Sequence, residues 1–335
     1  MACWYKETDK LNEIVISSRV RLARNLDNMP FPSRMTDEMF TELKSKVKSA
    51  LEKISEQGVA SLKFIEMDDI PENEIHSMVE RHVISPDFAR NSSNRAIAIS
   101  DDESISLMIG EEDHIRIQVI LPGSNLSEAY KIADDIDTAL GEILPLAFNE
   151  NLGYLTECPT NIGTGLRASV MLHLPVCESK GDIASISEAA AKIGLTVRGM
   201  YGEGSKAVAC LYQISNQITL GISEKNAIDN LLVIASQIVD REKQNRNSIE
   251  RIDLEDKVMR AYGTLKYAKL ISTEEFMKLI SLIKLGVSEG IIENKSIQPI
   301  RLLIEAQPHM IMRKYSVSNL KERDEARARM ASEIL

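Results

Sequence analysis

Hydrophobic and polar residues follow two different periods along roughly the first 220 residues, and together they predict a mixture of strands and helices. Runs typical of strands cover residues 13–20, 62–67, 96–100, 104–109, 115–120, 167–174, 195–199 and 207–214. Apolar residues at helical spacing recur in residues 36–57, 71–82, 126–146 and 183–193. We therefore expect a strand-rich domain that also contains several amphipathic helices.

The pattern changes after residue 220, where only helical spacing remains. Helices are predicted over residues 228–244, 254–270, 273–285 and 299–306, and a charge-dense helical tail follows them. This shift predicts two domains, with the strands in residues 14–244 and helices alone in residues 245–335.

Composition limits the classes of protein that fit. The chain has 335 residues, of which 44% are hydrophobic and 27% are charged, as in an ordinary globular protein. Its net charge of −10 disfavours a general nucleic-acid-binding surface. Its four cysteines lack metal-ligand spacing. No apolar run suits a membrane helix or a signal peptide. We therefore expect a cytoplasmic protein with no membrane or direct nucleic-acid partner.

Arginine recurs at strand positions or strand–loop junctions in segments that are otherwise apolar. The set consists of Arg19, Arg21, Arg116, Arg167 and Arg198. A strand would point Arg19 and Arg21 to one face, whereas we expect Arg24 to follow that strand. Clustered guanidinium groups repel one another unless an anion lies among them, and their planar fork suits phosphate oxygens. A nucleoside triphosphate with Mg²⁺ fits that need, and a solvated basic surface is the alternative.

A glycine-rich loop with a thiol precedes one of these strands. It reads T-E-C-P-T-N-I-G-T-G-L-R over residues 156–167. Glycines let the backbone approach a ligand closely, and a run of exposed N–H groups suits an anion. Cys158 is either a functional thiol in this loop or a small buried hydrophobic residue. The segment alone leaves both interpretations open.

Acidic residues occupy the same group of loops. Residues 111–114, E-E-D-H, are expected to form an acidic rim before the strand of Arg116, and Glu203 follows Arg198 in a second glycine-rich loop. These acids could simply pair with the arginines, or they could hold a cationic acceptor beside the phosphate. If the acceptor is a guanidinium, a carboxylate can orient it and accept its proton as the P–N bond forms. Nearby positive charge would also stabilise a thiolate.

Five segments, in order along the chain, resemble the catalytic domain of the phosphagen (guanido) kinases. They read S-S-R-V-R, E-E-D-H-I-R, C-P-T-N-I-G-T-G-L-R, R-G-M-Y-G-E and Q-I-S-N-Q-I-T-L-G, within about residues 14–225. Within this family the chain is most similar to bacterial protein arginine kinases, because it starts almost at the catalytic domain and adds a helical region from about residue 245. The resemblance implies an α+β fold, in which helices flank an antiparallel sheet and a helical carboxy-terminal domain follows. It also implies ATP-dependent phosphorylation of arginine side chains in proteins.

The resemblance implies roles for individual residues as well. ATP, with Mg²⁺, would contact Ser17, Ser18, Arg19, Val20, Arg21, His82, Arg116, Arg167, Ala168, Ser169, Val170, Met171, Arg198, Gly199, Met200, Tyr201, Gly202 and Glu203. Glu112 and Glu203 match the carboxylates that hold the acceptor guanidinium, and Cys158 matches the active-site cysteine. His82 stands in for the family's nucleotide-site histidine, which would align near Ile99. No metal site made only of protein ligands is expected.

The carboxy-terminal tail contains R-D-E-A-R-A, which matches a phosphoarginine-binding allosteric motif of the bacterial subfamily. Its residues are Arg323, Asp324, Glu325, Ala326, Arg327 and Ala328. On a helix, Arg323 and Arg327 share a face and could bind one phosphate, while Asp324 pairs with the guanidinium that carries it. A salt-bridged surface helix is the alternative.

The resemblance further implies partners and a role in the cell. It suggests a homodimer, a small zinc-containing activator protein, a heat-shock transcriptional repressor and a Clp protease, with phosphorylation marking proteins for degradation. Two other functions compete with this one. A kinase for a free small guanidino compound would share the whole site. A non-catalytic phosphoarginine-binding adaptor is disfavoured, because the acids, Cys158 and all five arginines are present.

Overall fold

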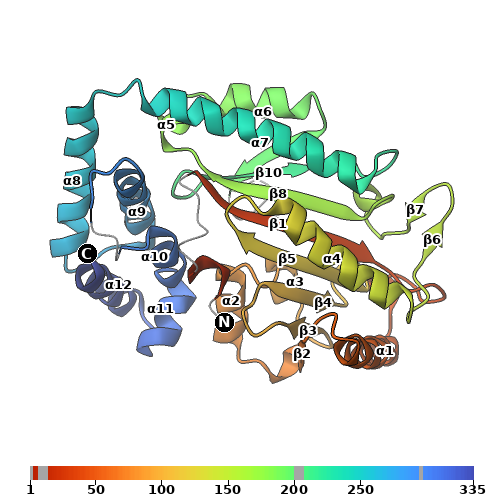
Figure 1. Cartoon of the computed structure of the whole chain (residues 1–335). Helices are drawn as coiled ribbons and strands as arrows, with labels where there is room; N and C mark the ends of the chain where they lie inside the picture. Colours follow the sequence, from red (N-terminus) through yellow and green to blue (C-terminus); the bar gives the residue numbers. More distant parts are fainter. Residues whose placement is uncertain (1–2, 7–13, 200–206, 294–296) are drawn as a thin grey trace.

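An eight-stranded antiparallel sheet forms the centre of the protein (Figure 1), seen in a computed structural model that describes residues 3–6, 14–199, 207–293 and 297–335. The strand order is β2-β3-β4-β5-β1-β8-β10-β9. The strands are β1 (Val15–Arg24), β2 (Lys63–Glu66), β3 (Ala96–Ile99), β4 (Ile105–Ile109), β5 (Ile115–Pro122), β8 (Leu166–His173), β9 (Leu195–Gly199) and β10 (Leu211–Asn216). A separate hairpin joins β6 (Phe148–Asn149) to β7 (Gly153–Tyr154). The expected antiparallel sheet is confirmed.

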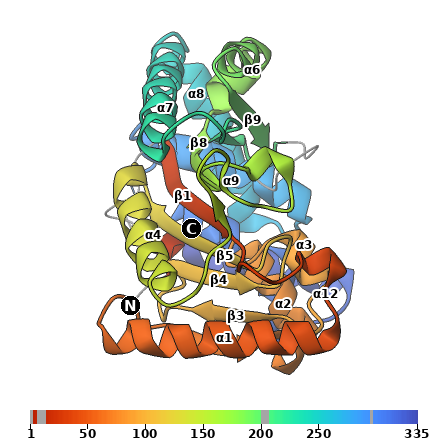
Figure 2. The ribbon, with the colours of Figure 1, turned by 90° about the vertical axis from the view of Figure 1, so that its right-hand side faces the viewer.

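Long helices cover one face of this sheet (Figure 2). They are α1 (Asp37–Glu56), α4 (Leu126–Gly141) and α7 (Glu224–Arg246), with the short helices α5 (Pro175–Ser179) and α6 (Ile183–Ala191) near the β9 edge. The core beneath them takes every second residue of the central strands, such as Val20 and Leu22 of β1. From Ser17 onward, strand alternation therefore leaves the odd-numbered residues of β1 on the opposite face, because an irregularity between Val15 and Ser17 shifts the register there.

The opposite face carries two separate apolar clusters. At the β2 end, α2 (Glu72–Glu80) and α3 (Pro86–Arg90) pack on Ile97 and Met108. Further along, Ile16, Ile120 and Met171 pack against the carboxy-terminal helices and the segment Trp4–Lys6. Polar side chains occupy the part of the sheet that neither cluster covers.

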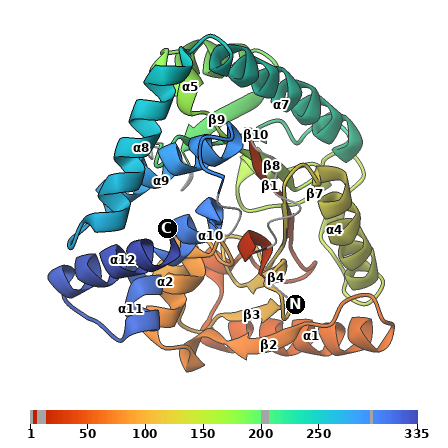
Figure 3. The ribbon, with the colours of Figure 1, turned by 60° about the vertical axis from the view of Figure 1, so that its left-hand side comes forward.

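The carboxy-terminal region is built from helices that gather beside the sheet (Figure 3). They are α8 (Arg251–Tyr267), α9 (Thr273–Ser288), α10 (Pro299–Glu305), α11 (Pro308–Tyr315) and α12 (Leu320–Ile334). Their shared apolar cluster includes sheet residues, so the helices and the sheet are in direct contact. The division of the chain at residue 244 stays a prediction. No helix among the described residues is long and apolar enough to cross a membrane.

The limits of several elements differ from those predicted. Strand β1 continues through Arg24, which was expected beyond it. The Arg24 side chain is buried on the helix-covered face, where Nη2 lies 2.6 Å from Asp137 Oδ2 and the guanidinium stacks 3.4 Å from the ring centre of Tyr154. This paired arginine is a structural residue. Strand β10 begins at Leu211 rather than at residue 207, and α4 ends at Gly141 rather than at residue 146.

Candidate active site

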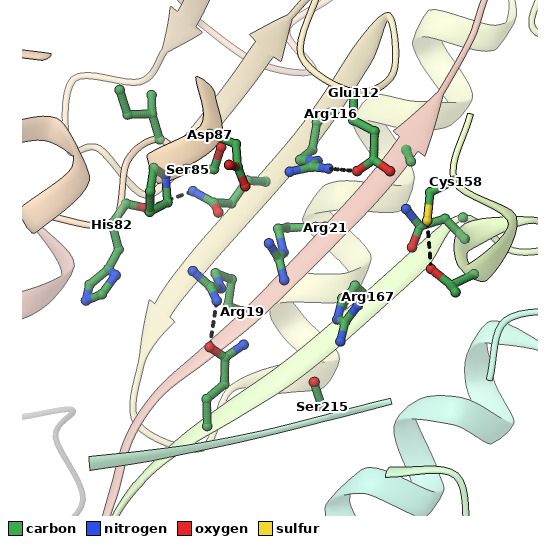
Figure 4. A pocket seen from close by; sticks show the side chains of 18 of the residues that line it. Arg19, Arg21, His82, Ser85, Asp87, Glu112, Arg116, Cys158, Arg167 and Ser215 are labelled. Carbon is green, nitrogen blue, oxygen red and sulfur yellow. Dashed lines mark hydrogen bonds and ion pairs between the residues drawn. The ribbon is translucent and has the colours of Figure 1, made fainter. Parts of the chain in front are cut away.

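A pocket of about 500 Å³ opens on the polar part of the sheet. This volume is in the usual range for a small-molecule ligand. All five arginines predicted from the sequence line it, on β1, β5, β8 and β9. Figure 4 shows Arg19, Arg21, Arg116 and Arg167 on neighbouring strands around the pocket. The predicted convergence of arginines is therefore present in the fold.

Strand register explains this convergence. Arg21 of β1 pairs with Arg167 of β8, and Ala23 of β1 pairs with Arg116 of β5. Side chains of directly paired residues lie on the same face of a sheet. Arg198 pairs with Gln213 in the same way at the β9 edge. Residues far apart in the sequence thus present their guanidinium groups to one ligand site.

The arginines repel one another in the absence of an anion. Burial, then the charges of Arg167 and Arg116, lower the pKa of Arg19 to about 10. Burial, then its arginine neighbours, also lower the pKa of Arg21 well below its ordinary value. Among the described residues, the buried Nε of Arg21 has no hydrogen-bond partner. Arginine stays protonated in proteins, so the lowered pKa values show that burial and mutual repulsion both disfavour these charges. A bound polyanion would offset much of that repulsion.

Two adjacent carboxylates contact the arginine cluster in different ways. Glu111 Oε2 lies 2.5 Å from Arg116 Nη1, and Glu112 Oε2 lies 3.1 Å from Arg116 Nη2. The Glu111 side chain is buried and also accepts a hydrogen bond from the Ser85 hydroxyl. The Glu112 side chain is 40% exposed and lines the pocket. Glu112 is therefore accessible to a second cation, whereas the buried Glu111 carboxylate fixes the Arg116 guanidinium in place.

The expected acidic rim at residues 111–114 is wrong. Asp113 and His114 are fully buried. One Asp113 oxygen accepts hydrogen bonds from Asn25 Nδ2 at 2.7 Å and from the Glu157 backbone N–H at 2.8 Å. The His114 ring accepts from the backbone N–H of Leu26. Asp113 and His114 hold loops together, which leaves Glu112 as the exposed acid of the segment.

Cys158 lines the pocket and is partly exposed, so the alternative of a small buried hydrophobic residue is wrong. Its Sγ lies 3.0 Å from Thr160 Oγ1. The surrounding loop is held by Thr219, whose hydroxyl donates to the carbonyls of Thr160 and Ile162 at 2.9 and 2.7 Å. Gly163 has a φ of +111°, and a Cβ there would lie 2.2 Å from the Thr219 carbonyl oxygen. The glycine is therefore required for this close approach.

The contiguous segments 17–21 and 167–171 point only some of their side chains toward the pocket. Val20, Ala168 and Val170 face the core beneath the long helices. Ser18 is buried, donates to the Gly123 carbonyl and accepts from the Asn125 N–H. The side chains of these four residues therefore point away from the pocket, because strand side chains alternate, and their contact with ATP stays a prediction. Ser17, Ser169 and Met171 line a small cavity that shares Arg19, His82 and Gln213 with the pocket.

His82 lies in the pocket wall together with Arg19. Its backbone has a left-handed φ of +63°. Burial, then the positive charge of Arg19, lower its pKa to about 3, so the ring is neutral at physiological pH. Gly199 ends β9 beside Arg198. Met200, Tyr201, Gly202 and Glu203 lie outside the described residues.

Several pocket residues escaped the sequence-based prediction. Arg19 Nη2 donates to Gln213 Oε1 at 2.9 Å, and Ser215 and Gln118 also line the pocket. Gln118 stands two residues after Arg116, and Ser215 stands two residues after Gln213. This alternation of polar residues within apolar strands is a signal that could have found them.

The R-D-E-A-R-A segment lies on α12, outside the pocket. Arg327 is 1% exposed. Its Nε donates to the Ala306 carbonyl at 2.9 Å, and its Nη1 donates to the Ile271 carbonyl at 2.8 Å and to Asp324 Oδ1 at 2.6 Å. Arg323 is only partly buried. The expected pair of arginines open to one phosphate is not present, because Arg327 bonds to the helical core.

Two family models match the chain and together cover most of it. Residues 42–245 match the model described as ATP:guanido phosphotransferase, C-terminal catalytic domain. Residues 251–335 match the model described as Protein-arginine kinase McsB C-terminal domain. The first match alone covers more than half of the chain.

Solved structures of guanidino kinases share the fold. A lombricine kinase superposes with a TM-score of 0.60 at 24% identity, covering 76% of this chain and 74% of that one. The duplicated taurocyamine kinase of Schistosoma mansoni gives 0.61 at 23% identity, covering 91% of this chain and 47% of that one. At these identities the likeness shows the fold alone.

Curated relatives are much more similar. The protein-arginine kinase of Halothermothrix orenii is 46% identical over 292 residues, covering 86% of this chain and 83% of that protein. The protein-arginine kinase of Desulforamulus reducens is 43% identical over 340 residues, covering 99% and 95%. The chain therefore belongs to the protein-arginine kinase branch of the ATP:guanido phosphotransferase family.

Proposed function

We propose that this chain transfers the γ-phosphoryl group of ATP to a guanidinium nitrogen of arginine side chains in proteins. The observation that carries this proposal is one pocket that combines five arginines, among them Arg21 with a strongly lowered pKa, with the accessible carboxylate of Glu112. The arginines suit a triphosphate, and the carboxylate suits a cationic acceptor. The names of the curated relatives support a protein as the source of that acceptor.

In this proposal the arginine cluster holds the nucleotide. Its guanidinium groups bind phosphate oxygens and stabilise charge in the transition state. They belong to Arg19, Arg21, Arg116, Arg167 and Arg198. Mg²⁺, when bound, neutralises charge on the terminal phosphates. Among the described residues no three His, Cys, Asp or Glu side chains lie close enough to hold a metal ion. A nucleotide-bound Mg²⁺ would take its ligands from the phosphates, from water and from at most one or two carboxylates.

The acceptor arginine would bind through carboxylates. Glu112 exchanges its contact with Arg116 for the incoming guanidinium and orients one nitrogen toward the γ-phosphorus. The P–N bond forms while the bond to the leaving ADP oxygen breaks, and the nitrogen's proton passes to a carboxylate. Glu203 is proposed as the second such carboxylate from the family resemblance. Cys158 is proposed to stabilise the bound guanidinium from the loop 156–165.

Incubation of the protein with ATP and one of two acceptors tests this function. An arginine-rich protein should be phosphorylated on arginine, and free arginine should not react at a comparable rate. Phosphorylation of free arginine alone would instead support a kinase for a small guanidino compound. ATP binding without any transfer would support a phosphoarginine-binding adaptor.

Several finer proposals rest only on the family resemblance. They are a cytoplasmic homodimer, phosphoarginine binding by residues 323–328 as an allosteric signal, and partnership with a zinc-containing activator, a heat-shock repressor and a Clp protease. The marking of substrate proteins for degradation is proposed on the same ground. Each needs the corresponding complex to be measured with purified components.

A further inference from the structure

We propose that Glu80 and Arg81 are positioning residues for the nucleotide pocket, through which the carboxy-terminal helices hold His82 in place. This inference rests on the proposed function, because it takes ATP as the ligand of that pocket. Three consecutive residues at the end of α2 have three different surroundings. Glu80 bonds to α11, Arg81 joins several segments, and His82 lines the pocket.

Glu80 anchors the first turn of α11 to α2, two helices that lie side by side in Figures 1 and 3. Its Oε1 accepts from the backbone N–H of His309 at 2.9 Å, and its Oε2 accepts from that of Met310 at 2.8 Å. These N–H groups have no partner within their own helix, and a carboxylate is favoured there. Glu80 is 7% exposed, so solvent does not weaken the contact.

Arg81 ties the end of α2 to neighbouring segments, and its side chain is 4% exposed. Its Nε donates to Glu103 Oε2 at 2.9 Å, in the turn between β3 and β4. Its Nη1 and Nη2 donate to Ser77 Oγ at 2.7 Å and to Glu74 Oε1 at 2.9 Å. Its carbonyl oxygen accepts from Trp4 Nε1 at 3.1 Å. The backbone immediately before His82 is therefore fixed from several directions.

The Glu74 carboxylate extends this network to the carboxy-terminal helices. Its second oxygen, Oε2, lies 2.9 Å from Arg313 Nε on α11. Arg81 Nη1 also lies 3.7 Å from Met310 Sδ on the same helix. The position of α11 is thus coupled to both residues that precede His82.

His82 needs such support because its backbone is strained. A φ of +63° is unfavourable for a side chain with a Cβ and persists only where the surroundings enforce it. Gln118 Nε2 donates to the His82 carbonyl at 2.8 Å, and the Trp4 ring lies 6.0 Å from the His82 ring. If the contacts of Glu80 or Arg81 weaken, the His82 ring should leave its place beside Arg19. A purely structural role for Glu80 would not affect ATP affinity.

The test measures ATP affinity by the fluorescence of Trp4, the single tryptophan of the chain. Glu80→Gln keeps the side-chain shape and removes the charge, so the ATP dissociation constant should rise about 5–10-fold, with the KM for the acceptor unchanged. Glu74→Gln should act in the same direction and keeps the protein testable if Glu80→Gln does not fold. The matched control is Glu255→Gln, which removes an exposed ion pair with Arg251 within α8 and should leave the ATP dissociation constant unchanged.

A double-mutant cycle identifies the route. In a His82→Asn background, Glu80→Gln should have no further effect on ATP affinity. An equal effect in both backgrounds would show that Glu80 does not act through His82. Unchanged ATP affinity in both single variants would overturn the inference and leave the proposed function standing. A parent protein that does not bind ATP would overturn both.

Discussion

At the scale of single residues, the arginines of β1 divide into two kinds. Arg24 is buried with its charge paired to Asp137, whereas Arg21 is surrounded by other guanidinium groups. A buried charge without a partner destabilises a fold, and a buried pair loses stability when one member is removed. The same residue type, three positions apart, thus serves ligand binding in one case and structure in the other.

This difference predicts opposite effects on stability. Arg21→Met should stabilise the ligand-free protein by about 1–3 kcal/mol and weaken ATP binding at least ~10-fold. Arg24→Met, its matched control, should destabilise the protein by about 3–5 kcal/mol, because it leaves Asp137 unpaired. Urea unfolding and ATP titration of both variants check this. A loss of stability in Arg21→Met with normal ATP binding would show that the arginine is structural.

Substitutions of Glu111 and Glu112 should also have different kinetic effects. Glu112→Gln should lower kcat about 10²–10³-fold with ATP affinity nearly unchanged, because the amide cannot accept the acceptor's proton. Glu111→Gln should instead raise the KM for ATP, because it weakens the support of Arg116. Steady-state kinetics of both variants distinguish the two roles. Equal effects on KM and kcat in the two variants would argue against this division.

Two buried histidines predict an acid-sensitive fold. Burial, then the charge of Arg19, lower the pKa of His82 from 6.5 to about 3, and burial, then nearby Lys284 and Arg246, lower that of His173 well below 6.5. Because both folded-state pKa values lie below the unfolded value, stability is full above pH ~6.5 and is lost as the pH falls. At pH 5 His82 should cost about 2 kcal/mol, and His173 should add a loss in the same direction.

Urea unfolding at pH 7 and pH 5 measures this loss. His82→Asn removes one titrating group and tolerates the left-handed backbone. Its loss of stability between the two pH values should be smaller than that of the parent by about 2 kcal/mol. An identical loss in both proteins would contradict the low folded-state pKa of His82.

At the scale of elements, the loop 156–165 is fixed by close backbone packing. Gly163→Ala would place a Cβ 2.2 Å from the Thr219 carbonyl oxygen. It should therefore displace the loop and lower turnover at least ~10-fold, because small displacements at a site are costly. Gly221→Ala is the matched control, since it also has a positive φ but nothing within 4 Å of the new Cβ. That variant should keep its activity and lose only about 1 kcal/mol of stability. Normal turnover in Gly163→Ala would show that the loop is not required.

The sequence predicted elements better than it predicted their environments. Strand and helix periods located the sheet, and the arginines found there do line one pocket. Periodicity could not show that Asp113 and His114 are buried, because their partners come from distant loops. The resemblance assigned residues 17–21 to ATP as one segment, although the Val20 side chain faces the core and its arginine neighbours face the pocket. The register between neighbouring strands decides which residues come into contact, and it cannot be read from the sequence.

At the scale of the whole molecule, the carboxy-terminal helices depend on Arg327. Asp324→Ala would leave this buried guanidinium without its carboxylate, so we expect a destabilisation of about 3–5 kcal/mol. Loss of phosphoarginine binding in that variant would therefore not by itself identify a sensor.

Arg323 allows the cleaner experiment. It is partly exposed, and Arg323→Ala should cost less than about 1 kcal/mol. If residues 323–328 bind phosphoarginine, this variant should bind it at least ~10-fold more weakly at normal stability. Calorimetric titration with phosphoarginine and a thermal unfolding scan measure both quantities. Unchanged binding would assign the segment to packing alone.

The central claim is that the arginine pocket and Glu112 transfer phosphate to arginines of proteins. The most direct test is mass spectrometry of a mixed-protein sample after incubation with ATP and the purified chain, kept under non-acidic conditions because phosphoramidates are acid-labile. We expect phosphorylated arginine side chains with the parent protein, and almost none with Glu112→Gln. Phosphate only on other residue types, or only on free arginine, would contradict the account.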